Sequence, residues 1–320
     1  QYELLPGSRD GDFRINEAGL RSRAFRIEKE AEVFRILLIG DSIAYGFGVE
    51  QNETFSVQFE DLHSMYWPDA QGRVEILNLG VAGYNIDQIV ENLLVRGLQF
   101  DPDLIVYGFC LNDPMTYSFE FEALKVQLSQ AKASYREGLM GKRGYLLSMS
   151  RLFLLAKYAW TSARDQGSDQ SKLEDKQWTA IADDSYDRFF SRVYEDVSAL
   201  NRLGSGLDQL KQIAREVDVP VVTVIFPLFH HLDAYRLEQL HGKVQEMHLE
   251  REMRVYDLLR LFGNLHDSQG RVYVHNVLHP NRLGHRLAAL YVLLKLMKDD
   301  MLPFSAQLGQ RPAPEDRALW

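Results

Sequence analysis

An apolar segment that ends in a glycine and two polar residues limits most strongly what this chain can fold into. Residues 36–39 are isoleucine and leucine with no polar alternation, which is typical of a strand covered on both faces of a parallel sheet. The segment leads into Gly40-Asp41-Ser42 and a glycine-containing loop. Parallel strands deliver active-site residues at their carboxyl ends. A reactive serine is therefore one interpretation, and a capping serine in an ordinary strand-to-helix turn is the other.

Four later apolar segments predict further strands, and stretches with helical spacing separate them. Strands are expected at 74–79, 104–109, 220–226 and 255–258. Helices are expected over 55–67, 86–100, 193–217, 234–251 and 281–298. Such alternation is typical of a parallel sheet with helices on both faces. We therefore predict an α/β fold with a flavodoxin-like, doubly wound, five-stranded parallel sheet.

The same rhythm divides the chain into segments. It runs over 35–114 and resumes over 191–300, which we assign together to one α/β domain. Residues 115–190 show mostly helical patterns without a convincing strand, so we predict a helical insert. Residues 1–34 are predicted to be an irregular lead-in and 301–320 a C-terminal tail.

Composition excludes several classes of protein. Of the 320 residues, 46% are hydrophobic and 25% charged, as in soluble globular proteins. The net charge of −9 opposes a nucleic-acid partner. The single cysteine, Cys110, lies in an apolar run, so we expect a buried thiol and no disulfide. No apolar run is long enough to span a membrane, and a start at Gln1 suggests that an N-terminal segment was removed.

Polar blocks elsewhere complete a pattern that acyl chemistry requires. Gly83 lies in the loop after the second strand, Asn112-Asp113 follows the third, and His279-Pro280-Asn281 precedes the last helix. Acyl transfer by a serine needs a base within hydrogen-bond reach and donors aimed at the developing oxyanion. In this order, the four blocks resemble those of the GDSL/SGNH hydrolase superfamily.

The resemblance implies a role for each block. Ser42 would be the nucleophile, and His279 would take its proton and later deliver it to the leaving group. The backbone N–H groups of Ser42 and Gly83 and the side chain of Asn112 would form the oxyanion hole. Gly83 is preferred to Gly80 because it lies beside Tyr84-Asn85 at the turn of the loop. No cofactor is implied.

One position departs from the family pattern. Members usually carry an aspartate three residues before the histidine, where this chain has Asn276. Three explanations remain open: a Ser-His dyad that Asn276 or a main-chain carbonyl orients, an acid from elsewhere such as Asp267, or a weakened or inactive catalyst. We favour the dyad with Asn276 as a helper.

Other residues near the loops are candidates for binding. The aromatic residues beside these loops are predicted to line a substrate pocket, with core packing as the alternative: Tyr45, Phe47, Tyr84, Phe109 and Phe229. His230, which adjoins the end of the fourth strand, is predicted at the pocket entrance or facing water. Adjacent histidines point apart on an extended chain, so we predict no metal site.

These features predict a serine-dependent O-acyl ester hydrolase that acts on a carbohydrate or a small ester. The lead-in from Phe13 to Arg21 resembles that of membrane-anchored, extracytoplasmic bacterial members, which often handle acetyl groups on polysaccharides. The resemblance thus implies an acetylated carbohydrate substrate, an extracytoplasmic location and a membrane anchor in the full-length protein. Alternatives are an O-acetyltransferase to a polysaccharide and a catalytically weakened carbohydrate-binding or assembly protein.

Overall fold

The computed structural model describes residues 3–10, 13–66, 73–116, 184–229, 232–265 and 279–303. The chain divides into two compact units, one formed by 1–116 with 187–320 and the other by 117–186. Nearly all of the second unit, including most of the predicted helical insert, lies outside the described residues, as do the segments 266–278 and 304–320. The description below concerns the first unit.

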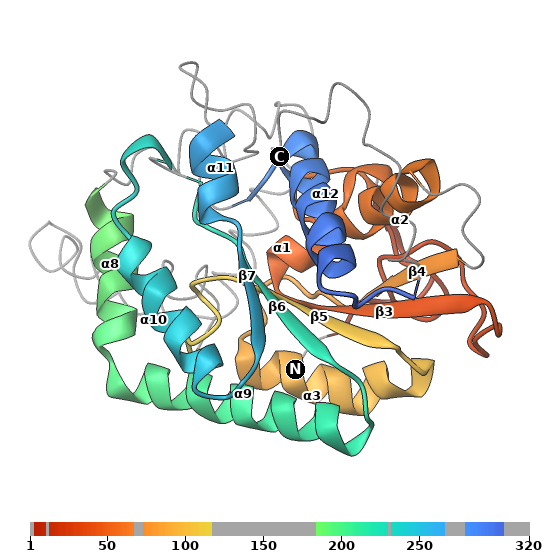
Figure 1. Ribbon diagram of the computed structural model, residues 1–320, viewed down its shortest axis with the longest axis horizontal. Coiled ribbons are helices and arrows are strands. Elements are labelled where there is room, and N and C mark those ends of the chain that lie inside the picture. The colour runs from red at the N-terminus through yellow and green to blue at the C-terminus, as the bar shows by residue number, and fades with distance from the viewer. Residues whose placement is uncertain are drawn as a thin grey trace, which may run out of the picture. The chain divides into compact units, whose positions relative to one another are not determined.

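Five parallel strands form the central sheet of this unit (Figure 1). Their spatial order is β4-β3-β5-β6-β7, so β3, the first strand of this sheet along the chain, lies between the second and third, β4 and β5. This is the flavodoxin-like order, in which the chain reverses direction of winding beside the first strand. The strands are β3 (Val33–Gly40), β4 (Arg73–Asn78), β5 (Leu104–Phe109), β6 (Val221–Ile225) and β7 (Arg254–Asp257). The predicted five-stranded α/β fold is confirmed.

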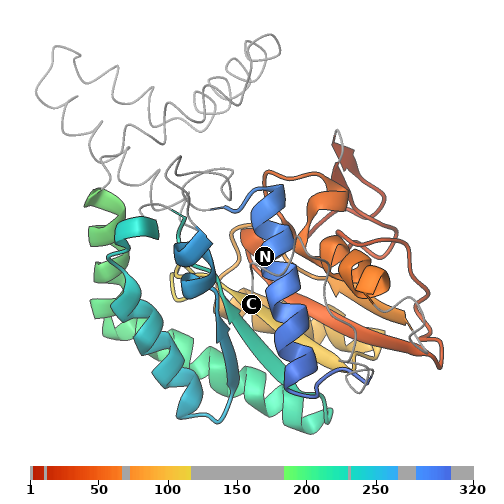
Figure 2. The same cartoon turned by 45° about the horizontal axis from the view of Figure 1, so that its top comes forward.

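Helices cover both faces of the sheet. Figures 1 and 2 show α2 (Phe55–Tyr66) and α12 (Arg282–Lys298) side by side on one face. The other face carries α3 (Ile86–Asn92) and α9 (Val197–Glu216), which contact each other. The other helical elements among the described residues are α1 (Ser42–Tyr45), η1 (Gln51–Glu53), η2 (Leu93–Gly97), η3 (Leu98–Phe100), α8 (Asp184–Glu195), η5 (Leu232–Ala234), α10 (Glu238–Leu249) and α11 (Leu259–Leu265).

Two predicted helices differ from the structure. The helix expected over 193–217 is interrupted between α8 and α9, because the Asp196 side chain accepts a hydrogen bond from the Ser198 N–H at 2.8 Å and so caps a new helix. The helix expected over 86–100 is present, but beyond Asn92 it changes to a π-helical turn and then a 3-10 turn. Helical periodicity alone does not encode either change.

The register of the sheet brings its polar carboxyl ends together. Gly40 at the end of β3 pairs with Gly108 of β5, and Leu38 pairs with Asn78 of β4. The loops that follow these three strands therefore begin side by side at one edge. The lead-in, predicted to be irregular, includes a short antiparallel pair of strands, β1 (Arg9–Asp10) and β2 (Phe13–Arg14).

Candidate active site

The turn after β3 is built around Gly40, a position where any other residue would displace neighbouring atoms. Gly40 has a φ of +153°, and a Cβ there would lie 2.6 Å from the Gly108 carbonyl oxygen and 2.7 Å from Cβ of Ala44. The chain can therefore turn directly from the strand into the four-residue helix α1. Asp41 caps this helix, since its Oδ1 accepts a hydrogen bond from the Ile43 N–H at 2.9 Å. Ser42 becomes the first residue of α1.

His279 meets this serine from the far end of the chain. Its Nε2 lies 2.8 Å from Oγ of Ser42, and the two residues are only 6% and 8% exposed. Helix α12 follows directly, capped by Asn281, whose Oδ1 accepts from the Gly284 N–H at 3.1 Å. The structure thus brings together the predicted nucleophile and the predicted base at hydrogen-bonding distance.

Asn112 joins the same cluster from the loop after β5. Its Nδ2 donates a hydrogen bond to Oδ2 of Asp41 at 3.0 Å, and the Ser42 hydroxyl lies 3.3 Å from the same carboxylate oxygen. A carboxylate only accepts when ionised, so this contact fixes which end of the amide is the NH₂ group. The Asn112 NH₂ group is therefore held against Asp41, the residue directly before Ser42.

Two glycines after β4 have different environments. The N–H of Gly80 already donates to Oδ1 of Asn78 at 2.9 Å, and a Cβ on Gly80 would lie 2.4 Å from the backbone nitrogen of Tyr45. Gly80 thus lets the loop pack closely against α1. Gly83 instead has a φ of +78°, in the left-handed region. Because the Gly80 amide is engaged, the geometry favours Gly83 as the predicted oxyanion donor.

A fully buried arginine from the lead-in holds the far end of α1. Arg21 has no exposed surface, and its guanidinium donates to the carbonyl oxygens of Tyr45, Gly46 and Val49. It also lies over the Tyr45 ring, 4.7 Å from the centroid. Burial lowers the pKa of Arg21 to about 10, which still leaves the group charged at neutral pH.

An aromatic side chain packs on the histidine. The rings of Phe47 and His279 have centroids 4.9 Å apart and are tilted by 39°. Phe47 is 39% exposed, so part of its ring faces solvent beside the serine and histidine. The sequence places Phe47 among the aromatic residues that could line a substrate pocket, but it gives no site role to Arg21. Arg21 lies neither in a periodic pattern nor at the end of an apolar run, so the sequence offers no signal for its role.

The other predicted binding residues have varied surroundings. Tyr45 is half-buried under the Arg21 guanidinium, as described above. Tyr84 and Phe109 are buried in the interior, which favours the alternative of core packing. His230 and Asn276 lie outside the described residues.

Several ionisable groups are buried behind the site. Asp113 accepts a hydrogen bond from the Tyr107 hydroxyl at 2.6 Å, and burial together with the Asp41 charge raises the pKa of Asp113 well above its usual range. Burial, reinforced by the charges of Asp41 and Asp113, also raises the pKa of the Cys110 thiol well above its usual range, so this cysteine is not a thiolate nucleophile. On α12, burial and the charges of Arg21 and His279 lower the pKa of His285 to about 3, which keeps its ring neutral.

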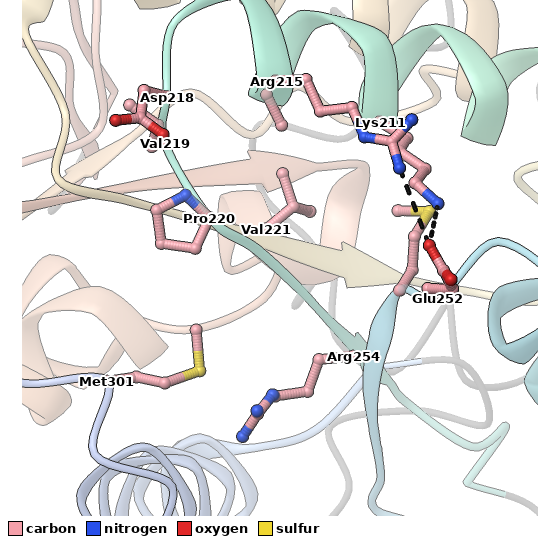
Figure 3. Close-up of a pocket in the computed structure, with 11 residues that line it drawn as sticks. Lys211, Arg215, Asp218, Val219, Pro220, Val221, Glu252, Arg254 and Met301 are labelled. Atoms are coloured by element: carbon pink, nitrogen blue, oxygen red, sulfur yellow. Dashed lines mark hydrogen bonds and ion pairs between the residues drawn. The ribbon is translucent and has the colours of Figure 1, made fainter.

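A separate hollow of about 460 Å³ opens at the opposite, amino-terminal end of β6 and β7 (Figure 3). Its cations are already paired, because Lys211 and Arg215 face Glu252 at 3.2 and 3.7 Å. Arg254 pairs with Asp299 at 2.5 Å. Surface pairs of this kind leave little net field for an anionic ligand, so this hollow is a weaker candidate than the serine-histidine cluster.

Among the residues that the structure describes, no group of three His, Cys, Asp or Glu side chains is arranged to hold a metal ion. Within the same residues, no helix is long and apolar enough to cross a membrane.

A serine paired with a histidine at the carboxyl edge of a parallel sheet is an arrangement suited to a serine hydrolase. Residues 38–287 match the model of the GDSL-like Lipase/Acylhydrolase family, a range that contains every residue of the cluster except Arg21. The chain belongs to this family. A comparison with curated proteins found no match.

Solved structures with a similar arrangement share little sequence with the chain. A two-domain esterase active on acetylated mannans has 13% identity and a TM-score of 0.47 over 88% of this chain, which spans about half (52%) of that protein. An acetylxylan esterase from Geobacillus stearothermophilus has 12% identity and a TM-score of 0.48, covering 85% of this chain and 96% of its own. A lipase/acylhydrolase from Enterococcus faecalis has 13% identity and a TM-score of 0.45, covering 87% and 99%.

Proposed function

We propose that this protein is a serine-dependent O-acyl ester hydrolase that works through an acyl-serine intermediate. The observation that carries the proposal is the 2.8 Å contact between Oγ of Ser42 and Nε2 of His279. A nucleophile and a base at this distance are the minimum that covalent acyl transfer requires.

In the first half-reaction, Oγ of Ser42 forms a bond to the acyl carbon while its proton moves to Nε2 of His279. The carbonyl electrons move to oxygen, where the backbone N–H groups of Ser42 and Gly83 and the Asn112 amide donate hydrogen bonds. The carbon-oxygen bond to the alcohol then breaks, and the alcohol oxygen takes the proton from His279. The acyl group remains on Ser42.

In the second half-reaction, water replaces the alcohol. His279 removes a proton from water as its oxygen bonds to the acyl carbon, and the same oxyanion donors stabilise the intermediate. The bond to Ser42 breaks, Oγ recovers its proton from His279, and a carboxylic acid leaves. No cofactor takes part in this scheme.

Asn276 acts in this proposal as a neutral helper that orients the His279 ring. An amide stabilises an imidazolium less than a carboxylate does, so Asn276→Asp should raise kcat. Activity before the change separates a working dyad from a disabled site: turnover only after Asn276→Asp would show that the native catalyst is inactive.

We propose an acetylated carbohydrate as the substrate. The partly exposed Phe47 ring, in contact with His279, supports this choice, because an aromatic face beside a reacting group suits the apolar face of a sugar ring.

The test begins with a serine-directed fluorophosphonate followed by mass spectrometry. We expect one adduct, on Ser42, together with hydrolysis of p-nitrophenyl acetate that Ser42→Ala or His279→Ala lowers by about 10⁴-fold or more. Absence of both the adduct and turnover in the unaltered protein would reject the hydrolase and favour a binding protein.

A second arm supplies an acetyl ester with and without a glycan acceptor. We expect acetate as the product in both cases, because water is the acceptor. Acetyl groups found on the glycan would instead identify an acetyltransferase.

A further inference from the structure

We propose that Arg21, outside the residues that touch the reacting atoms, is a positioning residue that sets Ser42 and Phe47 against His279. The proposal rests on the function proposed above, because it concerns the same site. It begins from where the guanidinium donates its hydrogen bonds.

The carbonyls that Arg21 binds belong to the end of the nucleophile helix and to the loop after it. Tyr45 is the last residue of α1, and Gly46 caps it with a left-handed φ of +84°. Their carbonyls lie 3.0 and 2.5 Å from Nη1 of Arg21, and the Val49 carbonyl lies 2.5 Å from Nη2. Carbonyls at the end of a helix have no partner within it, so a buried cation is what satisfies them here.

This loop is tied to the nucleophile by the main chain. The N–H groups of Gly46 and Phe47 both donate to the Ser42 carbonyl, at 3.0 and 2.9 Å. A shift of the loop would therefore move the Ser42 peptide as well as the Phe47 ring that contacts His279. The Arg21 side chain thus fixes both Ser42 and the Phe47 ring, two groups that contact His279.

The lead-in around Arg21 is itself anchored next to the site. Ser22 accepts a hydrogen bond from the Asn78 N–H at 2.6 Å, and the Asn78 side chain donates to the Ala44 carbonyl at 2.7 Å. On the other side, Oδ1 of Asn16 accepts from the Leu20 N–H at 3.0 Å. The Arg21 guanidinium therefore extends from a fixed backbone and can hold the loop after α1 in one position.

A second buried arginine offers a control. Arg35 is 1% exposed and also donates to main-chain carbonyls, those of Arg26, Ile27 and Phe100. Arg35 further forms an ion pair with Glu75 at 2.8 Å, so its loss removes more from the fold than a buried cation alone. It lies near the start of β3, at the opposite end of the strand from Ser42, and of the two arginines it is Arg21 that contacts the nucleophile loop.

The experiment compares Arg21→Ala and Arg21→Lys with Arg35→Ala and Arg35→Lys, with kcat on p-nitrophenyl acetate expressed per folded molecule. We expect the Arg21 variants to lose about 100-fold in kcat, the effect of a small misplacement of reacting groups, with little change in KM. Millimolar guanidinium should restore kcat in Arg21→Ala, and the Arg35 variants should keep the kcat of the unaltered protein.

Equal losses of kcat in the two lysine variants, or an unchanged kcat in Arg21→Lys, would overturn the proposal. So would failure of both Arg21 variants to fold while Arg35→Lys folds, because Arg21 would then be a general determinant of stability.

Hydrogen exchange over residues 42–50 separates this inference from the hydrolase proposal. Arg21→Lys should raise exchange in this segment more than Arg35→Lys does, whether or not the unaltered protein turns over an ester. Equal exchange in the two variants would reject the positioning role alone, and lack of turnover with the expected exchange would reject the hydrolase alone.

Discussion

The Asn112 side chain donates a hydrogen bond from Nδ2 to Oδ2 of Asp41 at 3.0 Å. This contact joins the loop after β5 to the cap of the nucleophile helix, across two neighbouring strands of the sheet. An NH₂ group has two hydrogens, so one can bind Asp41 while the other faces the acyl oxygen. The amide is thus oriented before substrate arrives.

Asn112→Ala should therefore lower kcat by about 10² to 10³-fold with a small change in KM, because an oxyanion donor acts mainly in the transition state. Steady-state kinetics on p-nitrophenyl acetate would measure this split. The control is Asn92→Ala, since Asn92 is buried and donates to the Leu79 carbonyl instead of to the Ser42 turn. An equal loss of kcat in both variants would mean that the effect is structural.

The two glycines after β4 should respond differently to an added methyl group. In Gly80→Ala the Cβ meets backbone atoms of Ala44 and Tyr45 at 2.7 and 2.4 Å, so α1 must move and both stability and kcat should fall. Gly83→Ala adds strain at a positive φ, with a cost of about 1 to 3 kcal/mol. Urea unfolding should show the larger loss for Gly80→Ala; the reverse order would contradict the packing described for this loop.

Phe47 should influence sugar esters more than small esters. Phe47→Leu removes the ring that contacts His279 and faces solvent, and an aromatic contact is worth about 0.5 to 1.5 kcal/mol. We expect KM for an acetylated oligosaccharide to rise about 3- to 10-fold, with a smaller change for p-nitrophenyl acetate. Equal effects on the two substrates would remove the support that Phe47 gives to a carbohydrate substrate.

A buried histidine on α10 should make the fold sensitive to acid. The Nδ1 of His248 donates to the Val244 carbonyl at 2.7 Å, and burial lowers the pKa of His248 to about 4. The unfolded chain then binds more protons between pH 6.5 and 4, so stability falls as the pH drops through this window. From pH 7 to pH 5 the loss is about 2 kcal/mol for this group. Urea unfolding at the two pH values should show a smaller loss in His248→Gln, and an unchanged loss would contradict the assignment.

Glu60 on α2 should have the opposite effect on the pH dependence of stability. Its Oε1 accepts from the Ile76 N–H at 2.7 Å and its Oε2 from Arg23, yet burial outweighs both contacts and raises the pKa of Glu60 to about 7. The folded chain binds the extra proton, so stability is present below pH 4.5 and lost as the pH rises through 7.

The loss for Glu60 between pH 5 and pH 8 is roughly 2.5 kcal/mol, and Glu60→Gln should reduce it. Arg23 keeps Asp61 as a partner in this variant, at 2.7 Å. A steeper fall in stability above pH 5 in Glu60→Gln than in the unaltered protein would show that the ion pair, not burial, dominates.

The sheet and the central pair of the site follow from local features of the sequence. Apolar runs such as 36–39 and 104–109 are typical of strands buried on both faces, and their polar ends lie together because parallel strands share an edge. Ser42 lies at a junction of strand and helix and His279 lies just before α12, where residue type and chain order both carry information.

The role of Arg21 and the contact of Phe47 with His279 could not be predicted in the same way. The main-chain contacts of Arg21 are with carbonyls 24 to 28 residues away, and every residue provides a carbonyl, so no residue pattern marks these partners. The Phe47 contact depends on the position of His279, which is set by the packing of α12 on α2. The break in the predicted helix at Asp196 has a local cause, a side chain that competes for a backbone N–H.

The hydroxyl and imidazole of the central pair lie 237 positions apart in the chain. During synthesis, the serine turn is made long before the segment that carries the base, so an early or locally opened form holds an alcohol with ordinary reactivity. For the proposed hydrolase, ester cleavage then begins only when His279 and the helix α12 that follows it are in place, so turnover requires a molecule that has finished folding.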